Sequence, residues 1–183
     1  TVNLLTGFSA GAENWLIADA RNTDLVVDTM VKARPTLFTG VNTLFGALVR
    51  HPQLGKADFS RLRLAIGGGA AIIPATSAQW KQITGQEIVE GYGLSETPAI
   101  LCLNPMGRSK FSATVGLPIP STDIVLLKDD ETPAALGEAG EICAKGPQVM
   151  SGYWRKPEAN AKAFSADGYF RTGDIGIFTE DGF

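Results

Sequence analysis

The segment Gly91–Glu96 brings an aromatic ring, a hydroxyl and a carboxylate into one short stretch of chain. A nucleotide could use all three groups, with the ring of Tyr92 stacking on a base and the hydroxyl of Ser95 contacting a phosphate. Glu96 could bind Mg²⁺, which often takes only one or two protein carboxylates together with phosphate oxygens. The residue chemistry equally allows a structural role, in which Glu96 caps a helix and Tyr92 fills a core.

Two further segments carry groups that suit a nucleotide. The run Gly67–Ala71 would let the backbone approach a flat ligand closely, and it would equally suit a flexible strand-to-helix turn. It matches neither the dinucleotide fingerprint nor the phosphate loop that ends in lysine. Asp174, in Thr172–Gly173–Asp174, could accept hydrogen bonds from a ribose diol or stabilise a turn.

A third pattern suggests a different chemistry. Residues 7–11 read Gly-Phe-Ser-Ala-Gly, which fits the G-x-S-x-G nucleophile elbow of serine hydrolases. That elbow needs a strand before Ser9 and a histidine partner. The residues before Ser9 look helical, and the sole histidine, His51, stands beside Pro52 at an expected helix end. We therefore expect no nucleophile at Ser9.

The expected secondary structure brings the two glycine loops together. A period-two strand ends at Ile66, a helix begins near Pro74, and the next strand ends at Glu90. A strand–helix–strand unit makes its two strands parallel, so the loops after Ile66 and Glu90 should share the carboxyl edge of one sheet. Open α/β sheets bind ligands at that edge.

The remaining pattern predicts an α/β protein with two parts. Residues 1–110 should form a partly parallel sheet with flanking helices. Residues 111–183 should form a smaller β-rich, distorted barrel-like subdomain, because glycine, proline and Asp-Gly turns separate short strand-like runs there. Trp80, Trp154 and Phe170 are expected to pack in cores. Further helices are expected over 25–33, 41–49 and 158–164, and further strands over 36–39, 124–128, 141–145, 169–172 and 175–178.

Composition excludes several classes of function. The chain has 183 residues and a net charge of −3, so it lacks the basic face of a general nucleic-acid binder. No apolar run approaches the roughly 20 residues that a membrane-spanning helix needs. Two cysteines, Cys102 and Cys143, form no CxxC pair, which favours a reducing, cytoplasmic setting. The ends, Thr1 and a half-complete hairpin at Phe183, suggest a chain truncated on both sides.

Four stretches in order resemble the acyl-adenylate-forming superfamily, or AMP-binding enzymes. Gly67–Ala71 resembles its adenine-flanking glycine loop, and Tyr92–Glu96 resembles its Tyr-Gly-x-Thr-Glu motif. Gly140–Pro157 resembles its Gly-Glu-Leu … Gly-Tyr-Trp-x-x-Pro motif, and Phe170–Asp174 resembles its Tyr-Arg-Thr-Gly-Asp motif. Within the superfamily, residues 39–45 and 145–150 look most like bacterial long-chain fatty acid–CoA ligases.

The resemblance implies a two-step reaction, in which a carboxylate and ATP give acyl-AMP and coenzyme A then displaces AMP. It implies that Tyr92 stacks on adenine, that Ser95 contacts the α-phosphate, and that Glu96 is the Mg²⁺ ligand. Asp174 would hold the ribose hydroxyls. Ser95 and Glu96 are thus the expected catalytic residues, and the expected nucleotide-binding residues are Gly68, Gly69, Ala70, Gly91, Tyr92, Gly93 and Asp174.

This sequence departs from the family pattern in several ways. Ser95 replaces the usual Thr and keeps its hydroxyl, and Tyr169 stands where the fatty-acyl signature usually has Trp. The family's lysine-bearing phosphate loop and C-terminal lysine are not among the residues, so we expect the chain alone to be an inactive piece of a ligase. The alternatives are an adenylating ligase for a short-chain, aryl or amino acid, and a non-catalytic binding module. Fatty acid, ATP and CoA are the expected partners, with a peripheral membrane contact of the longer protein left open.

Overall fold

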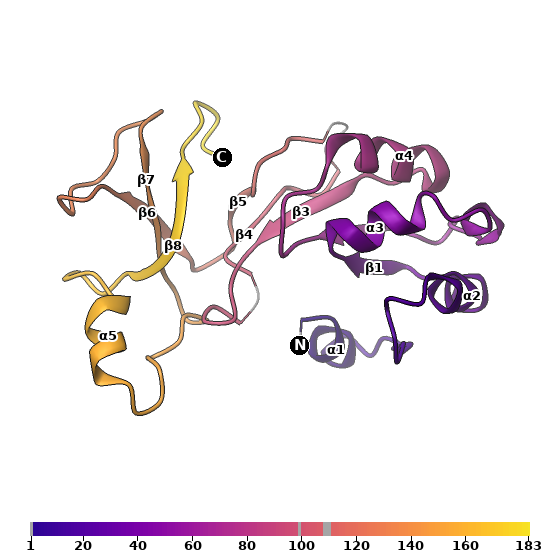
Figure 1. Ribbon diagram of the computed structural model, residues 1–183, viewed down its shortest axis with the longest axis horizontal. Coiled ribbons are helices and arrows are strands. Elements are labelled where there is room, and N and C mark those ends of the chain that lie inside the picture. The colour runs from indigo at the N-terminus through magenta and orange to yellow at the C-terminus, as the bar shows by residue number, and fades with distance from the viewer. Residues whose placement is uncertain (1, 99, 108–110) are drawn as a thin grey trace. The chain divides into compact units, whose positions relative to one another are not determined.

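The computed structural model describes residues 2–98, 100–107 and 111–183, and Figure 1 shows its elements. The chain divides into two compact units. Unit 1 comprises Thr1–Gly91 and Asn104–Thr114, and unit 2 comprises Tyr92–Leu103 and Val115–Phe183. The domain boundary expected between residues 110 and 111 adjoins 108–110, which lie outside the described residues.

Unit 1 contains three parallel strands, β1 (Leu37–Gly40), β2 (Leu64–Gly67) and β3 (Ile88–Tyr92), with β2 between the other two. Residues 65–67 of β2 pair with 88–90 of β3, which confirms the parallel strand–helix–strand unit predicted from the sequence. The period-two pattern of Leu62, Leu64 and Ile66 begins before the strand itself. Strand β2 begins at Leu64, and Leu62 is buried just before it.

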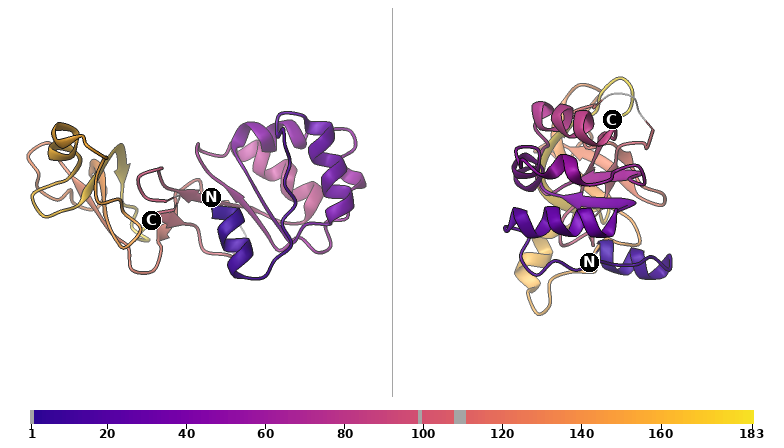
Figure 2. Two further views of the ribbon diagram at one scale, coloured as in Figure 1. Left: turned by 90° about the horizontal axis from the view of Figure 1, so that it is seen from below. Right: turned by 90° about the vertical axis from the view of Figure 1, so that its right-hand side faces the viewer.

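Three helices of unit 1 lie beside one another, in the order α2 (Thr23–Ala33), α3 (Asn42–Leu48) and α4 (Pro74–Thr84), as Figures 1 and 2 show. The sequence offered Asn22 or Thr23 as the cap of α2, and the side chain of Asn22 is the one that accepts the backbone N–H of Leu25. Pro74 stands in the first turn of α4, where its missing N–H costs no helical hydrogen bond.

An aromatic cluster forms the centre of the unit 1 core. Trp80 of α4 is fully buried, as predicted, and stacks on Phe38 of β1 at 5.7 Å between ring centroids. Phe45 of α3 meets the edge of Trp80 at 4.9 Å. Ala65 and Ile88 from the neighbouring strands join the same cluster, so the helices and the sheet share one apolar core.

Unit 2 contains an antiparallel sheet of three strands, in the order β6 (Asp123–Leu127), β7 (Ala139–Lys145) and β8 (Phe170–Ile177). The two runs expected at 169–172 and 175–178 are one continuous strand, β8. Among the described residues the sheet stays open and does not close into the distorted barrel suggested by the sequence. A shorter antiparallel pair, β4 (Cys102–Leu103) and β5 (Leu117–Pro118), completes the unit's strands.

The remaining elements are short, namely α1 (Val2–Ser9), the 3₁₀ turn η1 (Leu54–Lys56) and α5 (Pro157–Ala163). Ser9 ends helix α1 rather than following a strand, so the nucleophile-elbow geometry is absent, as expected. Phe170 is buried as predicted, whereas the prediction for Trp154 was wrong because 82% of its surface is exposed. Arg155 lies over the Trp154 ring at 5.4 Å, so this aromatic packs against a charged neighbour instead of a core.

No helix in the described part of the chain is long and apolar enough to cross a membrane.

Candidate nucleotide site

The first glycine loop lies beside Gly91, the residue of unit 1 at which the second glycine loop begins. Strand β2 leads into the first loop, and the parallel strand β3 leads toward the second. A Cβ built on Gly68 would stand only 3.3 Å from the carbonyl oxygen of Gly91. The backbones therefore approach each other at the carboxyl edge of the sheet, where the sequence placed Gly68, Gly69, Ala70 and Gly91.

Two side chains from other elements hold the exit of the first glycine loop. The Oε1 atom of Glu90 accepts the backbone N–H of Ile72 at 3.0 Å, and Oδ1 of Asn42 accepts the N–H of Ile73 at 2.9 Å. Glu90 is 8% exposed, and its Oε2 atom is buried without a protein partner. Burial raises the pKa of the Glu90 carboxyl, and the Ile72 bond partly opposes this shift.

A tight turn in unit 2 presents Ser95 and Glu96. The buried hydroxyl of Thr97 accepts the N–H of Leu94 at 2.9 Å and donates to the carbonyl of the same residue at 3.1 Å. The Thr97 N–H also donates to Leu94 O, which closes the turn. Ser95 is exposed on this turn, and neither it nor Glu96 lies in a helix, so the helix-capping interpretation of Glu96 does not apply.

A direct hydrogen bond joins Tyr92 to Asp174 across 82 residues of sequence. The Tyr92 hydroxyl donates to Oδ2 of Asp174 at 2.6 Å. Partial burial and the Asp174 bond both raise the pKa of Tyr92, so the phenol keeps its proton. The sequence assigned these residues to the two ends of a nucleoside, and the fold of unit 2 places them in contact.

A bulge in β8 presents Asp174. Arg171 faces Cys143 and Ile175 faces Glu141, so four residue steps on β8 face two steps on β7. The extra residues include Gly173, whose φ of +77° favours glycine over other residue types. Bulges of this kind redirect a side chain away from the regular pleat.

Glu141 of β7 stabilises this bulge with both oxygens of its carboxylate. Oε1 accepts the Gly173 N–H at 3.0 Å, and Oε2 accepts Nη1 of Arg171 at 2.7 Å. The Glu141 hydrogen bond raises the pKa of the Arg171 guanidinium, so Arg171 stays charged. Thr172 contributes a further bond from its hydroxyl to the carbonyl of Ile142 at 2.8 Å.

Glu96 is contacted by the segment that follows β7. The hydroxyl of Tyr153 donates to Oε1 of Glu96 at 2.9 Å, and the N–H of Met150 donates to the Glu96 carbonyl at 2.8 Å. The part of the chain that the structure describes contains no group of three or more His, Cys, Asp or Glu side chains able to hold a metal ion. A single carboxylate fits Mg²⁺, provided that a bound triphosphate and water supply the other ligands.

The structure thus arranges the expected site residues in three groups. Gly68 lies beside Gly91, Tyr92 bonds Asp174, and Ser95 shares a turn with Glu96. Sequence reasoning did not single out Glu90, Glu141 or Tyr153. Glu141 and Tyr153 lie in the Gly-Glu-Ile and Gly-Tyr-Trp stretches of a motif already recognised. The position of each polar side chain next to a glycine was the signal that could have identified them.

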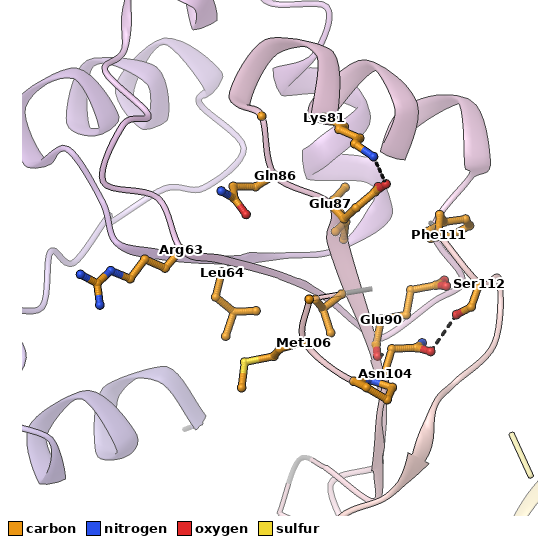
Figure 3. A pocket seen from close by; sticks show the side chains of 15 residues that line it. Arg63, Leu64, Lys81, Gln86, Glu87, Glu90, Asn104, Met106, Phe111 and Ser112 are labelled. Atoms are coloured by element: carbon orange, nitrogen blue, oxygen red, sulfur yellow. Dashed lines mark hydrogen bonds and ion pairs between the residues drawn. The ribbon is translucent and has the colours of Figure 1, made fainter. Parts of the chain in front are cut away.

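A separate cavity of about 240 Å³ lies in unit 1 (Figure 3). Its wall includes the Lys81–Glu87 ion pair, with Nζ and Oε1 2.6 Å apart, and Asn104, which accepts the Ser112 hydroxyl. Its lining includes none of the expected site residues. This cavity is lined by the amino-terminal parts of β2 and β3, whereas the glycine loops come after the carboxyl ends of these strands.

Comparison with known proteins identifies related sequences along the whole chain. The profile of the AMP-binding enzyme family matches residues 1–154. The long-chain-fatty-acid–CoA ligase of Salmonella typhimurium is 43% identical over 183 residues, which cover 100% of this chain and 32% of that protein. The chain therefore spans about a third of the length of the curated relatives it matches.

Solved structures give the same result at the level of the fold. The anthranilate CoA ligase AuaEII in complex with anthranoyl-AMP matches 98% of this chain and 34% of its own, with a TM-score of 0.90 and 26% identity. ATP-bound MatB from Rhodopseudomonas palustris matches 88% of this chain and 32% of its own, with a TM-score of 0.77 and 32% identity. Both comparisons extend over most of the residues described above.

Proposed function

Because the chain belongs to the AMP-binding enzyme family, we propose that it is the central part of a longer fatty acid–CoA ligase. The longer protein activates a long-chain carboxylate with ATP and transfers the acyl group to coenzyme A. Sequence identity of 43% to a long-chain-fatty-acid–CoA ligase over the full length of the chain supports this substrate class. The chain supplies much of the nucleotide site.

In this proposal the nucleoside lies against the edge of the sheet. The Tyr92 ring stacks on adenine and Asp174 accepts the ribose hydroxyls, and the family resemblance assigns the backbone of Gly68–Ala70 to adenine as well. Ser95 contacts the α-phosphate from the tip of its turn. Glu96 provides the protein oxygen for Mg²⁺, which would neutralise charge on the phosphates when bound.

The reaction needs positioning and charge stabilisation more than a protein nucleophile. In the first step a carboxylate oxygen of the acid bonds to the α-phosphorus, and the bond from that phosphorus to the bridging oxygen breaks, which releases pyrophosphate. In the second step the sulfur of coenzyme A bonds to the acyl carbon. AMP leaves with the bonding electrons, and the thiol proton passes to solvent.

The observation that carries the proposal is the Tyr92–Asp174 hydrogen bond. It ties the ring proposed for adenine to the carboxylate proposed for ribose, which are the two contacts that one nucleoside would make together. A carboxylate can accept several hydrogen bonds, so Asp174 can hold Tyr92 and still receive a diol. A module that had lost nucleotide binding would have no reason to keep this pair.

A second candidate is an adenylating ligase for another acid. Structural relatives include proteins described as an anthranilate CoA ligase and a benzoate CoA ligase, with TM-scores of 0.90 and 0.86. Tyr169 stands where the fatty-acyl signature usually has Trp. Its hydroxyl donates to Asp123 at 2.5 Å on the surface of unit 2. Substrate choice in this second candidate would rest on residues outside the nucleotide site.

We expect the longer protein to act in the cytoplasm on small molecules, namely fatty acid, ATP and CoA, and to bind no nucleic acid. A peripheral membrane contact would suit a lipid substrate. The 183-residue chain by itself should not synthesise acyl-CoA, because the lysine-bearing phosphate loop and the C-terminal lysine of the family are not among its residues.

ATP–pyrophosphate exchange by the full-length ligase tests the proposal, with palmitate, octanoate, acetate and benzoate as separate substrates. Exchange strongest with palmitate is the expected result. Exchange with benzoate or acetate alone would establish the second candidate, and no exchange with any of the four acids would refute the proposal. Asp174→Asn is the matched variant. It keeps the size of the side chain but loses the charge, and we expect the KM for ATP to rise about tenfold or more.

A further inference from the structure

The hydroxyl of Tyr153 contacts the carboxylate of Glu96, which is proposed to bind Mg²⁺. Tyr153 is 38% exposed, so it is not a core residue. Its hydroxyl nevertheless donates to Oε1 of Glu96 at 2.9 Å, across 57 residues of sequence.

The backbone of Tyr153 is held on both sides by one residue of α5. Oδ1 of Asn160 accepts the Tyr153 N–H at 2.7 Å, and Nδ2 of Asn160 donates to the Tyr153 carbonyl at 3.0 Å. These two bonds use both ends of the amide and fix the residue from which the ring projects. Asn160 therefore holds the backbone from which the Tyr153 side chain reaches Glu96.

The same segment also holds the backbone of Glu96. The Met150 N–H donates to the Glu96 carbonyl at 2.8 Å. Gln148 anchors the segment further back, since its Nε2 atom donates to the Thr122 hydroxyl at 2.7 Å. Glu96 is thus bound at its main chain and at its carboxylate by residues only three apart, Met150 and Tyr153.

We propose that Tyr153 is a positioning residue for the metal-binding carboxylate, held in place by Asn160. This inference rests on the proposed function of Glu96. The bond from the tyrosine hydroxyl to Oε1 restricts the orientation of the carboxylate and leaves Oε2 as the oxygen that would hold the metal. Groups that orient a metal ligand in this way typically change metal affinity by about 10- to 100-fold, and exposure of this bond reduces the expected effect to about 3- to 10-fold.

The test compares Tyr153→Phe with the wild type in the full-length ligase. Phe keeps the ring and removes only the hydroxyl, so the fold is preserved. We expect the Mg²⁺ concentration for half-maximal pyrophosphate exchange to rise about 3- to 10-fold. The rate at saturating Mg²⁺ and the KM for the fatty acid should stay within about twofold.

Calorimetric titration without fatty acid supplies a readout apart from activity. Wild-type protein should bind ATP more tightly with Mg²⁺ than with EDTA, and Tyr153→Phe should reduce that ratio while leaving the EDTA affinity unchanged. Asn160→Asp keeps the acceptor for the Tyr153 N–H and removes the donor to its carbonyl. We expect it to show a smaller shift in the same direction.

Tyr169→Phe is the matched control. Tyr169 also donates its hydroxyl to an aspartate on the surface of unit 2, at 2.5 Å from Asp123, but it does not contact the expected site residues. Its Mg²⁺ dependence should equal that of the wild type. The inference is overturned if Tyr153→Phe and Tyr169→Phe have the same Mg²⁺ dependence and Mg²⁺-ATP affinity. It is equally overturned if Tyr153→Phe binds Mg²⁺-ATP more tightly, which would show that the hydroxyl competes with the metal.

Failure of the inference differs from failure of the proposed function. If the wild-type ligase shows no exchange and no Mg²⁺-dependent ATP binding, the nucleotide site itself is wrongly assigned. If the wild type shows both and the Tyr153 variant is indistinguishable from it, only the positioning role is refuted.

Discussion

Replacing Glu90 by Leu should loosen the glycine loop at one backbone amide, that of Ile72. The Ile72 N–H donates to Oε1 of Glu90 at 3.0 Å, and the Glu90 side chain is more than nine-tenths buried. Leu has a similar reach and fits an apolar surrounding, but it offers no acceptor. The Ile72 N–H would then be buried without its partner.

The structure sets the size of this effect. A buried donor left without a partner costs about 1–3 kcal/mol, and each 1.4 kcal/mol is a factor of ten in an equilibrium constant. Local opening at Ile72 should therefore become about 5- to 150-fold more frequent in Glu90→Leu. The neighbouring Ile73 amide keeps its bond to Asn42 and provides an internal reference.

Glu90→Gln separates the hydrogen bond from the charge. The Gln carbonyl can still accept the Ile72 N–H, so the amide should stay protected. Burial raises the pKa of Glu90, so the stability linked to its proton is present below the unfolded value of 4.5 and is lost as pH rises through the folded pKa. Gln cannot ionise, so this variant should be more stable than the wild type at neutral pH, with a gain that fades as pH falls toward 4.5.

Hydrogen–deuterium exchange of peptides covering residues 68–73, measured at constant pH 7, is the direct assay. Glu87→Gln is the matched control, because Glu87 precedes the same strand but pairs with Lys81 at 2.6 Å away from the loop. We expect faster exchange at Ile72 in Glu90→Leu alone. Wild-type exchange in that variant, or equal acceleration in Glu90→Leu and Glu90→Gln, would refute the role of the carboxylate as the acceptor.

Three other outcomes follow from the structure. Trp80→Ala empties a fully buried site in the unit 1 core and should lower the free energy of unfolding by about 3–5 kcal/mol, measured by circular dichroism in urea. Gly68→Val should weaken ATP binding at least about tenfold, because its Cβ would stand 3.3 Å from the Gly91 carbonyl oxygen. Gly55→Val is the control, since a Cβ at Gly55 meets no atom within 4 Å, and this variant should bind ATP normally. Burial raises the pKa of both buried thiols, Cys102 and Cys143, to about 11, so a thiol reagent at pH 8 should label them only after unfolding.

The sequence predicted well those elements whose ends are marked by particular residues. Pro74 begins α4 and Gly85 ends it, and α2 is capped by Asn22, one of the two residues, with Thr23, that could have capped it. The parallel pairing of β2 with β3 followed from connectivity alone, and it correctly placed both glycine loops at one edge. These predictions succeeded because each depends on residues close together in the chain.

Features that depend on distant residues were not predictable. The Tyr92–Asp174 bond spans 82 residues, and no local pattern indicates it. The bulge after Arg171 merges two expected strands into one, since its hydrogen bonds to β7 continue on both sides of the extra residues. Trp154 looked like a core residue from its type alone, but its neighbours in space leave it exposed.

The segment from β7 to Trp154 illustrates why a motif can recur in a site without contacting the ligand. It carries none of the residues that the resemblance assigned to ATP, yet it supports both groups of such residues in unit 2. At its start, Glu141 bonds the Gly173 N–H and Arg171, which fixes the bulge that presents Asp174. At its end, Tyr153 bonds the carboxylate of Glu96. Because Glu141 supports the proposed ribose acceptor and Tyr153 supports the proposed metal ligand, a change at Glu141 should alter nucleotide affinity and a change at Tyr153 should alter Mg²⁺ affinity, and both should leave recognition of the acid unchanged.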